Sequence, residues 1–133
     1  QENPYGVQKA GFFLYSKDLN GFFGTCCHYL VIDFCGDQPV DKAYLWFGCN
    51  VPWKAWIDGK QVFEQKFHAC CNQEFSEEMT FALTGKPQRM GFKLAARTEK
   101  IEIEWALRQM NDDRTKAISP YIPGIRYKVW HGK

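Results

Sequence analysis

Residues 53–67 carry the feature that most limits what this chain can fold into: a turn dipeptide between two runs of alternating apolar residues. The dipeptide is Asp58-Gly59, and both residue types accept the positive φ angles that a tight turn between antiparallel strands requires. The segment therefore predicts a β-hairpin. Two registers fit it: a two-residue loop places Ala55 opposite Val62, and a three-residue loop with a glycine bulge places Ala55 opposite Phe63.

Alternation with a period of two recurs along most of the chain and predicts further strands. Outside the hairpin these strands cover residues 11–15, 28–34, 43–49, 79–83, 90–94, 100–109 and 125–130. A helix is the competing interpretation for residues 100–109. We reject it because apolar residues at every second position would be scattered around the whole circumference of a helix. A single helical turn is the most that residues 73–78 predict.

Eight or nine short strands separated by turn residues predict an all-β fold, an antiparallel β-sandwich or jelly roll. A chain of 133 residues is too short for two ordinary domains, so we expect one domain over residues 1–133.

The cysteines predict an oxidising compartment. Six of them fall within a third of the chain: Cys26, Cys27, Cys35, Cys49, Cys70 and Cys71. An even number of cysteines in a small domain is typical of secreted proteins with disulfide staples, and six cysteines allow 15 pairings. A zinc site is the rival interpretation, but the two-to-four-residue gaps of structural zinc sites are missing, so we expect no metal. A free thiol or an intermolecular bridge also stays open.

Charge and hydropathy disfavour several classes of partner. The net charge is only +2, from 17 basic and 15 acidic residues scattered along the chain, so no basic run marks a surface for nucleic acid or a membrane. No apolar run approaches the roughly 18 residues of a transmembrane segment. Phosphate-binding glycine loops and dinucleotide motifs are absent, and we expect no cofactor.

Four short segments resemble a known module. They are residues 43–48 (Ala-Tyr-Leu-Trp-Phe-Gly), 56–62 (Trp-Ile-Asp-Gly-Lys-Gln-Val), 83–86 (Leu-Thr-Gly-Lys) and 101–105 (Ile-Glu-Ile-Glu-Trp). Together they resemble the PA14-like and galactose-binding-like β-sandwiches of secreted carbohydrate-active proteins, over about half the chain. The resemblance implies a sandwich fold and carbohydrate recognition. Calcium-binding members have paired aspartates where this chain has Gly-Cys-Asn-Val-Pro at 48–52, so calcium is not expected.

Carbohydrate recognition requires flat aromatic faces for the apolar side of a sugar ring and polar groups for its hydroxyls. The hairpin region supplies both, in the candidate ligand-binding residues Asn50, Trp53, Trp56, Asp58 and Lys60. The two tryptophans lie on opposite faces of one strand because their numbers differ by three. We expect Trp53, nearer the loop, to be the exposed one. The alternative is that both only pack in the core.

Residues for catalysis are poorly placed. No serine lies in a Gly-x-Ser-x-Gly frame, and a carboxylate pair of Asp33 with Glu102 or Glu104 is equally explained as a solvated strand face. The sequence therefore predicts a secreted, non-catalytic binding protein whose partner is a glycan or a glycosylated surface. The alternative is a secreted factor, such as a toxin or host-directed modulator, that binds an extracellular protein through its cysteine-rich loops.

Overall fold

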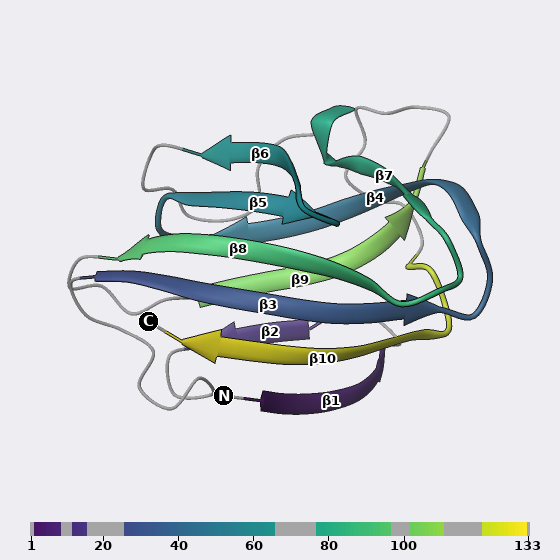
Figure 1. Ribbon diagram of the computed structural model, residues 1–133, viewed down its shortest axis with the longest axis horizontal. Helices are drawn as coiled ribbons and strands as arrows, with labels where there is room; N and C mark the ends of the chain where they lie inside the picture. The colour runs from purple at the N-terminus through teal and green to yellow at the C-terminus, as the bar shows by residue number, and fades with distance from the viewer. Residues whose placement is uncertain are drawn as a thin grey trace.

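Two antiparallel β-sheets make up the computed structural model, which describes residues 2–8, 12–15, 26–65, 77–96, 102–110 and 121–132 (Figure 1). Sheet A has the strand order β1 (Glu2–Gln8), β10 (Ile125–Gly132), β3 (Cys26–Gly36), β8 (Gln88–Ala96), β5 (Trp53–Ile57), β6 (Lys60–Gln65). Sheet B has the order β2 (Phe12–Tyr15), β9 (Glu102–Gln109), β4 (Val40–Cys49), β7 (Thr80–Leu83). The predicted all-β, two-sheet architecture is confirmed.

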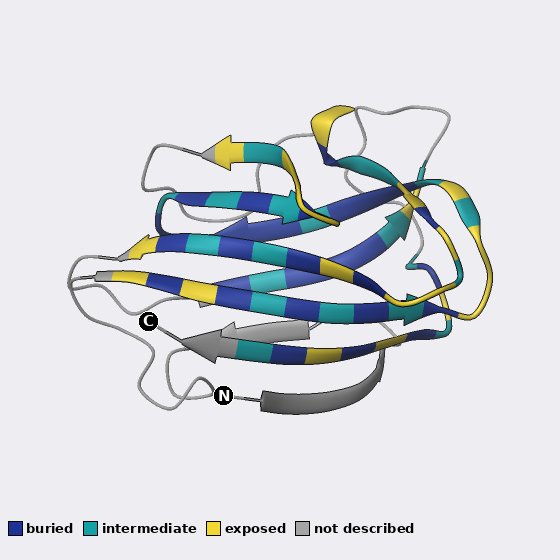
Figure 2. Cartoon of the chain, viewed as in Figure 1, coloured by how far each residue is buried: buried dark blue, intermediate teal, exposed yellow. Residues whose placement is uncertain are grey.

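The core lies between the two sheets. Alternate residues of β3, β8 and β10 are buried and the residues between them are more exposed, which gives the banded pattern along β3 and β8 in Figure 2. In β4 and β9 most described residues are buried. Phe47 of β4 stacks on Phe92 of β8 with ring centroids 4.2 Å apart, and the indole of Trp105 donates to the sulfur of Met90. Apolar burial between two half-polar sheets is therefore the main stabilising force of this fold.

The predicted hairpin is present as β5 and β6. Asp58 and Gly59 have φ angles of 50° and 83°, the pair of positive values that a two-residue type I′ turn requires. Ile57 pairs with Lys60 and Trp56 with Gln61, but a bulge follows, and Ala55 lies opposite Phe63. The observed register thus combines the short loop of one alternative with the pairing of Ala55 expected from the other.

The expected strands were too few, because ten strands are present among the described residues against the eight or nine predicted. The strand missed is β1, which lies at the edge of sheet A and pairs with β10. The alternating pattern predicts no strand over these residues, which include Pro4. An edge strand tolerates proline because one side of it needs no hydrogen-bond donors, and the register of β1 shifts next to this residue. The helical turn expected within residues 73–78 overlaps η2 (Glu77–Met79), and residues 73–76 lie outside the described residues.

Three of the six cysteines are described with their side chains, and all three are free thiols. Cys27 and Cys35 lie on the outer face of β3, about 26 Å apart along the strand, too far to bridge each other. Cys49 is buried in the core, and burial raises the pKa of its thiol to about 12. Cys70, Cys71 and the side chain of Cys26 are outside the described residues, so disulfide staples stay a prediction.

Candidate functional site

The two hairpin tryptophans are placed the opposite way round from the expectation. Trp53 is only 2% exposed and packs in the core with its ring centroid 4.6 Å from that of Phe47. Trp56 points to the outer face of sheet A and is partly exposed. The expectation relied on the loop lying close to Trp53. The alternation of side chains along β5 decides which tryptophan is buried, because Trp53 shares its face with the buried residues Ala55 and Ile57.

Trp56 belongs to a row of side chains that crosses sheet A. The register places it beside Gly91 of β8, Gly91 beside Val31 of β3, and Val31 beside Trp130 of β10. On the other side, Trp56 pairs with Gln61 of β6. We call these five outward residues the tryptophan row. The backbone positions of its two tryptophans are three strand spacings, about 14 Å, apart across the sheet.

Gly91 has no side chain, so the middle of the tryptophan row is less filled than its two ends. A Cβ atom built on this glycine meets no other atom within 4 Å, so the space above it is open. Tyr29 lies in the neighbouring row and is 47% exposed, the largest exposure of any bulky apolar residue among those described. Trp56, Trp130 and Tyr29 therefore surround a shallow open area on the outer face of sheet A.

A hydrogen-bonded carboxylate holds Trp130. Its indole nitrogen donates to Asp33 Oδ2 at 3.0 Å, and Arg89 binds both oxygens of the same carboxylate, through Nε at 2.6 Å and Nη2 at 3.0 Å. The hydrogen bonds from Arg89 and then Trp130 keep the pKa of Asp33 below its ordinary value. Two fixed bonds from a charged partner thus set the orientation of one end of the row.

The sequence analysis missed Trp130 and Tyr29 as site residues. Their signal was present, because the alternation in residues 28–34 and 125–130 already placed both on the polar faces of their strands. Alternation along a strand does not show which other strands lie beside it. Only the order β10-β3-β8-β5 brings residues 29, 56 and 130 onto one surface.

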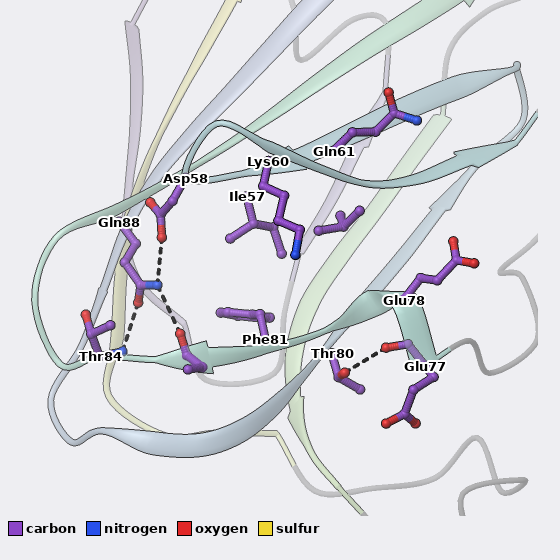
Figure 3. Close-up of a pocket in the computed structure, with 12 residues that line it drawn as sticks. Ile57, Asp58, Lys60, Gln61, Glu77, Glu78, Thr80, Phe81, Thr84 and Gln88 are labelled. Carbon is purple, nitrogen blue, oxygen red and sulfur yellow. Dashed lines mark hydrogen bonds between the residues drawn. The ribbon is translucent and has the colours of Figure 1, made fainter.

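A cleft lies between the β5–β6 hairpin and β7, at the end of the tryptophan row that contains Gln61 (Figure 3). Its volume is about 650 Å³, and it includes Asp58 and Lys60 of the predicted ligand residues. Ile57, Val62 and Phe81 supply its apolar wall. The remaining lining residues are Gln61, Glu77, Glu78, Thr80, Ala82, Thr84 and Gln88.

Asp58 uses its carboxylate inside the protein. Oδ2 accepts from Gln88 Nε2 and Oδ1 accepts from the backbone nitrogen of Arg89, both at 3.0 Å. The amide of Gln88 also donates to Ala82 O and accepts from Thr84 N, so this buried side chain joins the hairpin turn, β7 and the loop before β8 (Figure 3). The geometry therefore gives Asp58 a structural role at the end of the cleft.

Lys60 points into the cleft from the hairpin, across from Phe81 of β7 (Figure 3). Glu77 at the rim is paired with Lys42. Asn50, the fifth predicted ligand residue, is half-buried in the connection between β4 and β5 and lines neither the cleft nor the tryptophan row. The structure thus does not bring the five predicted residues together: Trp53 is in the core, Asp58 and Lys60 line the cleft, Trp56 is on the outer face of sheet A, and Asn50 is in the β4–β5 connection.

Two other groupings considered from the sequence do not assemble in the described part of the chain. Asp33 lies on the outer face of sheet A and Glu104 on a strand of sheet B, so these carboxylates do not face each other. The side chain of Glu102, the other candidate for this pair, is outside the described residues. Among the described residues, no three side chains of the metal-binding types come together. No helix in the described ranges has the length and apolar character needed to cross a membrane.

Comparison with protein-family models, curated proteins and solved structures found no match to this chain.

Proposed function

We propose that this protein is a secreted, non-catalytic glycan-binding protein and that the outer face of sheet A is its binding surface. The observation that carries the proposal is the tryptophan row, with Trp56 and Trp130 at its two ends and an open area over Gly91 between them. The resemblance of the strand and hairpin segments to galactose-binding-like sandwiches supports the same class of ligand. The six cysteines support an extracellular location.

The chemistry of the face suits a sugar chain. Indole and phenol rings pack against the apolar C–H faces of pyranose rings, and nearby charged and amide side chains bond the hydroxyl groups. The separation of about 14 Å between the backbone positions of the two tryptophans spans more than one sugar ring, which favours an oligosaccharide lying across the strands. Because Asp33 already holds Trp130, little side-chain entropy is lost when a ligand binds there.

A glycan array with the intact protein, followed by titration of the best ligand, tests this proposal. We expect Trp56→Ala and Trp130→Ala each to weaken binding by about tenfold or more, since losing one aromatic anchor costs over about 1 kcal/mol. The matched control is Trp46→Ala. Trp46 is also partly exposed, but it lies on the outer face of sheet B, so its loss should leave glycan affinity unchanged.

The proposal fails if the array shows no binding and tryptophan fluorescence does not change during sugar titrations. It also fails for this surface if Trp46→Ala weakens binding as much as Trp56→Ala does. Melting temperatures of the three variants separate lost affinity from lost folding.

A second candidate function is that of a secreted factor that binds an extracellular protein. The cleft between the hairpin and β7 favours it, because a hollow of about 650 Å³ with an apolar wall and a polar rim is of the size that binds side chains of a partner. Capture on target-cell membranes that survives enzymatic deglycosylation, together with a blank glycan array, would support this candidate over the first.

A further inference from the structure

We propose that the glycan bound on the outer face of sheet A is anionic, a polysaccharide carrying carboxylate or sulfate groups. This inference rests on the proposed function and specifies its ligand class. It arises from where the cations of sheet A lie relative to the tryptophan row.

Cations lie on both sides of the row. The register places Lys128 and Arg89 on the two sides of Asp33, in the row of side chains next to Trp130 and Val31. It places Lys93 and Lys54 in the row on the other side, beside Tyr29. A ligand that follows the tryptophan row therefore passes between two lines of positive charge.

Lys54 and Lys93 are direct neighbours across β5 and β8. Like charges directly opposite each other on a sheet destabilise it, so strand pairing gives no reason for this arrangement. Glu64 lies 3.3 Å from Lys54 and offsets one of the two charges. No ion pair of Lys93 occurs within the described part of the chain, and its side chain is next to the open area over Gly91. An anionic ligand group above Lys93 would relieve this repulsion.

The charge of the whole face agrees with that of the row. The outward positions described on β3, β5, β6, β8 and β10 carry five cations and two carboxylates, a net charge of +3, which exceeds the +2 of the entire chain. The cations are Lys54, Arg89, Lys93, Arg126 and Lys128, and the carboxylates are Asp33 and Glu64. Asp37, directly after β3, pairs with Arg126 and offsets one of these cations. The remaining excess of positive charge on the described positions attracts polyanions over a distance of about one Debye length.

Matched polymers that differ only in charge test the inference with the intact protein. Polygalacturonate is compared with its fully methyl-esterified form, and dextran sulfate with dextran, which distinguishes carboxylate from sulfate. We expect at least one charged polymer to bind about tenfold or more tightly than its neutral partner, with the difference shrinking as salt is added. Lys93→Gln should weaken binding of that polymer by about threefold or more and leave its neutral partner unchanged. Lys86→Gln, an exposed cation in the turn before β8, is the control and should change neither.

Each other outcome has a definite meaning. Equal affinity for charged and neutral polymers overturns the anionic ligand while the glycan proposal stands. Binding to none of the four polymers overturns the anionic ligand, and the glycan array then decides whether the glycan proposal stands. Single-stranded oligonucleotides combine phosphates with bases that stack on aromatic rings, so they are titrated in parallel. Tighter binding to an oligonucleotide than to every glycan would assign the face to nucleic acid and overturn the inference.

Discussion

At the scale of single residues, the function of a tryptophan in this chain depends on which face of its strand it occupies. Trp53 and Trp56 are three positions apart on β5, and one is buried against Phe47 while the other is partly exposed beside Gly91. Neither composition nor distance from the loop separates them. The alternation of side chains along β5 separates them, since the face that carries Ala55 is the buried one.

Replacement of Trp53 and Trp56 by alanine should therefore have different consequences. Trp53→Ala leaves a large cavity in the core and should lower the free energy of unfolding by roughly 3–5 kcal/mol. Trp56→Ala should lower it by no more than about 1 kcal/mol, because part of that side chain is already in solvent. Urea unfolding followed by circular dichroism measures both. A Trp53→Ala variant that unfolds like the wild type but loses glycan binding would contradict the buried position.

At the scale of elements, the β5–β6 hairpin is fastened to the rest of sheet A by its own turn. Asp58 accepts from Gln88 and from the backbone of Arg89, while its backbone nitrogen donates to Arg89 O at 2.8 Å. The residue that predicts the turn from sequence thus also fixes the turn to β8. Gln88 extends the connection to β7, so one wall of the cleft is tied to the other.

Asp58→Ala should lower the free energy of unfolding by about 1–3 kcal/mol, because it leaves the buried amide of Gln88 with an unpaired donor. Asp58→Asn is the matched variant. Asparagine accepts the positive φ angle and retains one acceptor for the backbone of Arg89, so its cost should be smaller. Thermal unfolding of the two variants makes the comparison. An equal loss in both would contradict the prediction, because it would show that the acceptor and the turn preference retained by asparagine contribute nothing.

At the scale of the whole molecule, an ion pair on sheet A links stability to pH. Asp33 joins β3 to Arg89 of β8 and to Trp130 of β10, and these bonds lower its pKa in the folded state below the ordinary value of 3.8. The folded protein then binds fewer protons than the unfolded chain in this range. The stabilisation from Asp33 is complete above the unfolded pKa and is lost as pH falls through the lower, folded pKa.

The wild type should therefore lose more stability than Asp33→Asn between about pH 4 and about pH 2. Urea unfolding at a series of pH values measures this difference, and comparison with the variant removes the contribution of the other carboxylates. Arg89→Gln should reduce the same pH dependence, since Arg89 is the main cause of the shift. Parallel curves for the wild type and Asp33→Asn would exclude the linkage.

The sequence by itself determined the strands, because alternation and turn chemistry depend on neighbours within a few residues. The runs at 28–34 and 43–49 are strands, β9 covers the described part of the run at 100–109, and Asp58-Gly59 is the turn. It also supplied the residue types of a sugar-binding surface. Sequence patterning did not predict the edge strand β1, because Pro4 weakens the local strand pattern. An edge strand tolerates proline, since one of its sides forms no hydrogen bonds to another strand.

Only the tertiary structure decided which strands are neighbours, and with that the surface on which function is proposed. Trp130, Tyr29 and Trp56 are far apart in the sequence and share one face because β10, β3, β8 and β5 lie side by side. The pairing of Lys54 with Lys93 arises in the same way. Strand order follows from burying all the apolar faces together in one core, a collective result that no local pattern contains.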